Sequence, residues 1–84
     1  MGKIGVVLKL MPESPETDLE SIKEAAKEKV DVNDMDVQDV AFGLKAVMIS
    51  TVVQDDQGGT DEVEESLSEI EGVQSVEVED VQKL

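Results

Sequence analysis

The chain has 84 residues, a length typical of one small domain over 1–84, and its 21 acidic residues against 7 basic ones give a net charge of −14. His, Cys, Trp and Tyr are absent, which excludes disulfides, thiolate or imidazole metal sites, and nucleophilic catalysis by Cys or His. The negative charge and the lack of stacking aromatics also argue against direct nucleic-acid binding and against an anionic membrane surface.

The first half of the chain predicts a strand, a helix and a second strand. Residues 4–10 are rich in β-branched and apolar side chains and are followed by Met11-Pro12, a pattern typical of a strand. The segment 17–20 predicts a capping box with Thr17 as the N-cap. A helix with one apolar face follows, formed by Leu19, Ile22, Ala26 and Val30. After a polar break at 31–34, alternation over 35–40 predicts a strand with one solvated face.

The second half predicts a strand, a helix and a last strand. Residues 44–53 are mostly apolar on both faces, so we expect this strand to be central in its sheet. A loop over 54–59 follows, and Thr60 is expected to cap a second helix. The apolar face of that helix comprises Val63, Leu67 and Ile70. Gly72 is expected just past its C-terminus, and alternation predicts a final strand from 73 to about 81.

The element order βαββαβ predicts a ferredoxin-like α+β sandwich. We expect a four-stranded antiparallel sheet with both helices on one face. Because strand–helix–strand crossovers are right-handed, the first and third strands should be central and the second and fourth should form the edges.

No motif for a metal or a phosphate is convincing. Asp55-Asp56 before Gly58-Gly59 has oxygen ligands for a cation, but an acidic loop near a helix start explains the segment more simply. The acidic segment 31–36 lacks the central Gly and terminal Glu of a calcium loop. The glycine pair is not followed by the Lys and Ser or Thr of a phosphate-binding loop. We therefore expect no metal site and no cofactor.

The acidity itself has two explanations. Carboxylates are spread along the whole chain, which favours a solvated acidic shell, as in a salt-adapted protein; the alternative is a surface for a basic partner. No apolar run approaches the roughly 20 residues of a membrane span, and no secretory leader pattern is present. Together with the absence of Cys, these features are consistent with a cytoplasmic protein.

Two residues do not fit a purely structural explanation. Phe42 is the only aromatic residue, and it lies between Ala41 and Gly43, where the chain turns between two predicted strands. Core packing and anchoring in a partner's apolar pocket are equally compatible with that position. Lys83 is the only cation after Lys45. A frayed terminal lysine is the commoner case, but a lone ammonium on an acidic body can also act as a point charge on a partner.

Several segments, in this order and at this length, carry a resemblance to a known family. They are KLMPESP at 9–15 with Asp18-Leu19, AFGL at 41–44, EESL at 64–67 with IEGV at 70–73, and the terminal Gln82-Lys83-Leu84. On these segments the chain resembles the archaeal elongation factor 1-beta family, the guanine-nucleotide exchange factors of the GTPase elongation factor 1-alpha, over nearly its whole length.

The resemblance implies a non-covalent exchange factor rather than an enzyme, acting in translation elongation on the GDP-bound GTPase. Lys83 matches the family's near-terminal lysine, whose ammonium disturbs the partner's magnesium site and promotes GDP release and GTP loading. Phe42 matches the aromatic residue that enters an apolar pocket on the GTPase. By the same resemblance, Gly43, Gln82 and Leu84 are expected to be neighbouring partner contacts.

Two other functions remain open from the residues alone. One is a small ferredoxin-like regulatory domain that senses a small molecule or a metal, which would need convergent polar groups that the sequence does not identify. The other is a structural or assembly module without activity. A sensing domain would show ligand-dependent melting of the isolated chain.

Overall fold

Four strands and two helices follow one another in the order that the sequence predicts. The computed structural model describes residues 2–54 and 60–83, with Phe42 described by its backbone alone. The elements are β1 (Lys3–Pro12), α1 (Leu19–Lys29), β2 (Val32–Asp39), the short 3-10 helix η1 (Ala41–Gly43), β3 (Lys45–Gln54), α2 (Asp61–Ser68) and β4 (Val73–Lys83).

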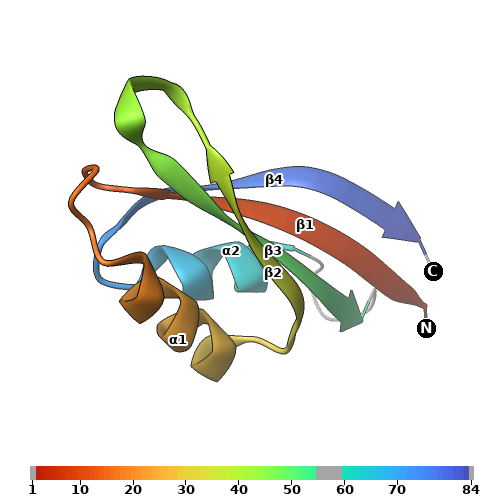
Figure 1. The fold of residues 1–84 in the computed structure, drawn as a ribbon. Coiled ribbons are helices and arrows are strands. Elements are labelled where there is room, and N and C mark those ends of the chain that lie inside the picture. The colour runs from red at the N-terminus through yellow and green to blue at the C-terminus, as the bar shows by residue number, and fades with distance from the viewer. Residues whose placement is uncertain (1, 55–59, 84) are drawn as a thin grey trace.

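The strands form one antiparallel sheet in the order β2-β3-β1-β4. β1 and β3 are central, and β2 and β4 are the edges, as right-handed crossovers require. Figure 1 shows α1 and α2 side by side on one face of the sheet, and no described helix lies on the other face. The predicted ferredoxin-like α+β fold is therefore confirmed.

The core lies between the helices and the covered face of the sheet. Along β1, the side chains of Ile4, Val6, Leu8 and Leu10 are buried and alternate with partly exposed ones, as expected for a strand covered on one face. The β3 side chains opposite them, the helix side chains above and two residues after α2 complete the cluster: Val47, Ile49, Ile22, Ala26, Val63, Leu67, Ile70 and Val73. Each fully buried aliphatic side chain of this kind contributes about 1.5–3 kcal/mol to folding.

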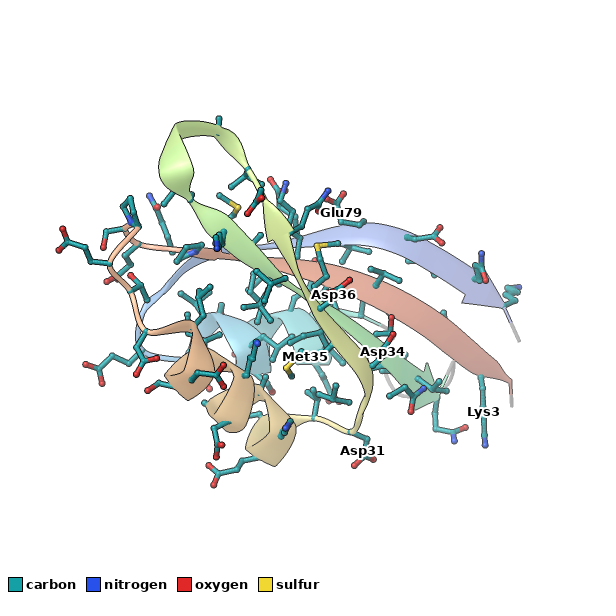
Figure 2. The ribbon with its side chains drawn as sticks, viewed as in Figure 1. Lys3, Asp31, Asp34, Met35, Asp36 and Glu79 are labelled. Atoms are coloured by element: carbon teal, nitrogen blue, oxygen red, sulfur yellow. The ribbon has the colours of Figure 1, made fainter. Side chains whose placement is uncertain are left out.

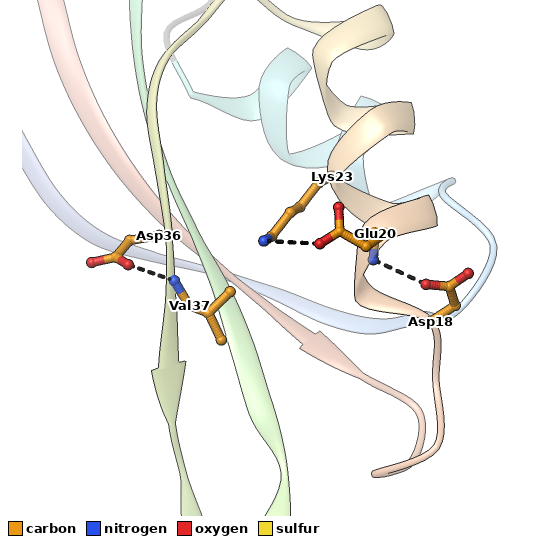
Figure 3. Close-up of polar contacts among 5 residues, drawn as sticks. All are labelled: Asp18, Glu20, Lys23, Asp36 and Val37. Carbon is orange, nitrogen blue, oxygen red and sulfur yellow. Dashed lines mark hydrogen bonds and ion pairs between the residues drawn. The ribbon is translucent and has the colours of Figure 1, made fainter.

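The first helix is capped by Asp18, and the prediction that Thr17 is the N-cap is wrong. Asp18 has an extended backbone, its Oδ1 accepts the Glu20 N–H at 3.1 Å (Figure 3), and its Oδ2 accepts the Ser21 hydroxyl at 2.9 Å. The Thr17 hydroxyl instead accepts the Ser14 N–H at 3.1 Å. Thr and Asp are both good N-cap residues. Asp18 is the N-cap because it is the last residue before the helix begins at Leu19.

Replacing Asp18 with alanine should lower the free energy of unfolding by about 1 kcal/mol, because an N–H of the first helical turn loses its acceptor. Urea unfolding followed by circular dichroism measures this change. Asp18→Asn keeps an oxygen acceptor and is the matched control, for which we expect a smaller loss. Equal stability of Asp18→Ala and the parent chain would contradict the capping role.

The second helix differs from the prediction at both ends. Thr60 occupies the N-cap position, but within the described residues its side chain makes no capping hydrogen bond. The C-cap is Glu69, so Gly72 lies further on, in the turn before β4, with a φ of 96°. A Cβ on Gly72 would also meet the Thr17 methyl at 3.0 Å. Glycine is required there for its backbone angle and for close packing against the turn before α1.

β2 begins at Val32, so the predicted polar break over 31–34 is wrong. Val32 pairs with Thr51, and a register irregularity between Val32 and Asp34 accommodates Asn33. The buried Thr51 hydroxyl donates to the carbonyl of Asp31 at 2.5 Å, which fixes the entry to this strand. An extra residue in one strand breaks the alternation on which sequence reasoning depends.

Two backbone N–H groups of β2 donate to side chains of the same strand. The Met35 N–H donates to Asp34 Oδ1 at 2.9 Å, and the Val37 N–H donates to Asp36 Oδ1 at 2.9 Å; the second bond is drawn in Figure 3. Among the strands that the structure describes, β2 pairs with β3 alone, so its other side is a sheet edge. These carboxylates therefore supply acceptors for donors on an edge strand.

Candidate functional site

Phe42 and Lys83 lie at opposite ends of the sheet. η1 precedes the first residue of β3, whereas Lys83 pairs with Ile4, which in turn pairs with Val53 near the last residue of β3. Figure 1 shows the turn between β2 and β3 at one end and both termini at the other. The longest extent of the molecule is 41 Å. A single partner that contacts both residues must therefore follow the long dimension of this domain.

The turn between β2 and β3 is a closed structure held by its own backbone. The Val40 N–H donates to the Leu44 carbonyl at 2.9 Å, and the Leu44 N–H donates to the Ala41 carbonyl at 3.3 Å. Ala41 and Gly43 are exposed on either side of Phe42. Gly43 has a φ of 76° and open space where a Cβ would stand, so its backbone angle rather than crowding explains the glycine. The side chain of Phe42 lies outside what the structure describes.

Lys83 is the last residue of β4, and its side chain is exposed. The predicted strand end near Val81 is thus wrong, because ladder pairing continues through Gln82–Gly5 and Lys83–Ile4. This pairing fixes the backbone from which the ammonium projects. The three ion pairs found within residues 2–54 and 60–83 involve Lys9, Lys23 and Lys29 rather than Lys83. Leu84, the other expected terminal contact, lies outside the described residues.

Gln82 and Lys83 face opposite sides of the sheet. Lys83 is opposite Ile4, whose side chain belongs to the core, so Lys83 projects at the helix-covered side near the sheet's end. Gln82 is opposite Gly5 and faces the uncovered side. The two expected neighbours can therefore contact different parts of a partner.

A second ammonium, missed by sequence reasoning, lies at the same end of the molecule. Lys3 is the first residue of β1, adjacent in sequence to the Ile4 that pairs with Lys83, and it is exposed (Figure 2). The antiparallel pairing of the first and last strands places these two lysines at the same end of the sheet although 80 positions separate them. The predicted strand order could have revealed this arrangement. When the first and last strands of a chain are antiparallel neighbours, the start of one lies beside the end of the other.

The acidic segments considered for a metal ion lie partly within the described residues. Among residues 2–54 and 60–83, no three acidic side chains are grouped closely enough to hold a metal ion. The segment 31–36, considered above as a calcium loop, is largely part of β2. Asp55-Asp56 and Gly58-Gly59 lie outside the described residues. Neither α1 nor α2 is long and apolar enough to span a bilayer.

Comparison with known proteins identifies a family and a set of full-length relatives. Residues 5–84 match the model of the family described as the EF-1 guanine nucleotide exchange domain. Proteins named elongation factor 1-beta are similar over nearly their whole length. The one from Methanothermobacter thermautotrophicus is 44% identical, covering 100% of this chain and 99% of the relative. Those from Methanosphaerula palustris (47%, covering 93% of each) and Halobacterium salinarum (40%, covering 100% of each) agree with it.

Proposed function

The chain belongs to the EF-1 guanine nucleotide exchange domain family, and on this premise we propose that it accelerates the exchange of GDP for GTP on the translation GTPase elongation factor 1-alpha. Relatives that share its full length and 40–47% of its residues support this assignment. An exchange factor of this kind forms no covalent bond. It lowers the barrier to GDP release, and GTP in excess then rebinds. Its place of action is the cytoplasm, where elongation takes place.

The proposed mechanism places the Lys83 ammonium beside the magnesium site of the GDP-bound GTPase. Magnesium bridges the nucleotide phosphates and the GTPase loops and neutralises their charge. An ammonium that competes for the metal's ligands supplies a weaker charge in its place, so GDP is held less tightly. The exposure of Lys83 at a strand end, where pairing with Ile4 fixes its backbone, is the single observation that carries this step.

Phe42 would act at the other end of the domain as the docking anchor. Its backbone lies in a turn closed by the Val40–Leu44 hydrogen bond, between two exposed neighbours. Burial of one aromatic ring in a partner's pocket is worth roughly 1.5–3 kcal/mol. Because this anchor and Lys83 are at opposite ends, docking at the turn would orient the whole length of the domain, with Gly43, Gln82 and Leu84 as lesser contacts.

Stopped-flow release of a fluorescent GDP analogue from elongation factor 1-alpha tests this function. The full chain should accelerate release, and a chain that ends at Gln82 should bind the GTPase but accelerate release little, because it lacks the ammonium. Equal acceleration by both chains would exclude the proposed mechanism. No acceleration by the full chain would exclude the function itself.

The sensing alternative has weaker support in the described residues. A regulatory site would need polar groups converging on a ligand. Ligand-dependent melting of the isolated chain would favour it over exchange.

A further inference from the structure

The face of the sheet opposite the helices contains a shallow hollow of about 240 Å³ above β1 and β3. We call it the open-face hollow. Among its lining residues are Gly5, Val7, Ser50, Val52, Asp80 and Gln82. Of these, Gly5, Val7, Ser50 and Val52 are partly buried and form its floor, while Asp80 and Gln82 are exposed on β4.

Gly5 is one of the residues that line the hollow. In the pairing register Gly5 lies between Val52 of β3 and Gln82 of β4, all facing the uncovered side. A glycine there leaves a gap in a row of outward side chains. Glycine inside a strand weakens the strand and often marks a close approach of another chain.

Carboxylates flank this floor on both edges of the sheet. One row across the four strands is Asp34, Ser50, Val7 and Asp80. The next row has Asp36 on β2 and Glu77 on β4, with Met48 and Lys9 between them. Glu79 also belongs to the β4 edge, where it lies 3.8 Å from the Lys9 ammonium (Figure 2). A partner segment fits this surface when it carries an apolar side chain for the floor and basic residues for the carboxylates.

The hollow lies at the same end of the sheet as the proposed site of action, on the opposite face. Gln82 lines it, and the next residue is Lys83. A partner surface that receives the Lys83 ammonium therefore lies within reach of the hollow. We propose that the open-face hollow receives an apolar side chain from a basic segment of elongation factor 1-alpha. This contact, which rests on the proposed exchange function, holds the C-terminal end of β4 at the nucleotide site.

Filling the hollow tests the proposal. In Gly5→Val the new methyl groups occupy the hollow, and valine favours strand structure, so thermal stability should be equal or higher. The concentration of factor that gives half-maximal GDP release should rise at least about tenfold, because the partner's apolar side chain can no longer be buried in the hollow. The maximal rate should change little, because Lys83 is intact. Ser75→Val on the same face, opposite Met11 and outside the hollow, is the matched control and should behave as the parent chain.

A second pair of variants tests the acidic rim independently of packing. Asp80→Lys should weaken binding at low salt more than Glu65→Lys, which makes the same charge change on an exposed position of α2, on the other side of the sheet. If Gly5→Val folds and exchanges at parent concentrations, the hollow is empty in the complex and the proposal is wrong. If Gly5→Val does not fold, equal binding by Asp80→Lys and Glu65→Lys overturns it. If the parent chain itself does not accelerate GDP release, the proposed exchange function is wrong. Failure of the hollow proposal alone differs from this result, because the parent chain would then still accelerate release.

Discussion

Replacing Lys83 with alanine should abolish accelerated GDP release from elongation factor 1-alpha and leave the fold unchanged. The side chain is exposed at the end of β4 and contributes nothing to the core cluster, so unfolding should shift little. Opposite unit charges about 4 Å apart interact by about 4 kcal/mol at an effective dielectric near 20. We therefore expect the exchange rate to fall on the order of 100-fold or more. Release of a fluorescent GDP analogue at saturating factor measures this loss.

Lys3→Ala is the matched control for this experiment, because it removes one ammonium from the same end of the sheet. If the position of Lys83 matters, Lys3→Ala should lower the maximal rate only slightly. Lys83→Arg keeps the charge but carries a planar, larger group, so its rate should lie between those of the parent and Lys83→Ala. Equal losses for Lys3→Ala and Lys83→Ala would show that general charge at this end, and not a placed ammonium, drives release.

Replacing Phe42 with alanine should affect docking and leave the chemistry of release intact. We expect the half-maximal concentration of factor to rise about 10- to 100-fold, which corresponds to roughly 1.5–3 kcal/mol of lost apolar burial. The maximal rate of GDP release should stay close to that of the parent chain. Titration of the release rate against factor concentration separates these two quantities.

The stability of Phe42→Ala decides between an anchor and a core residue. Because both sequence neighbours of Phe42 are exposed, we expect the free energy of unfolding to change by less than about 1 kcal/mol. A loss of about 3–5 kcal/mol, typical of a buried aromatic side chain, would assign Phe42 to the core. Ala41→Ser changes the same turn but keeps the phenylalanine. It should alter neither the half-maximal concentration of factor nor the free energy of unfolding.

The fold was predictable from the sequence because its elements repeat simple periods. The apolar face of α1 and the alternation in β1 follow from spacing alone, and the right-handed crossover rule gave the strand order. Details that depend on single residues were not predictable in this way. Thr17 and Asp18 are both good caps, and the extra residue Asn33 shifts the alternation that would have revealed the start of β2.

The candidate site was only partly accessible to sequence reasoning. Lys83 and Phe42 attract notice because each is chemically isolated in the chain. Their separation to opposite ends of the sheet, and the presence of Lys3 beside the C-terminal end, depend on which strands pair. The open-face hollow could not be predicted from the sequence, because it depends on which residues of the neighbouring strands pair with Gly5.

The two aspartates that accept N–H groups within β2 have a consequence for the solution behaviour of the protein. An uncovered edge strand is a template on which another chain can add a strand and begin a fibre. Where Asp34 and Asp36 already accept the donors of Met35 and Val37, an incoming backbone finds two of its partners occupied and meets negative charge as well. The β2 edge of the domain is thereby protected against strand addition by other copies of the chain.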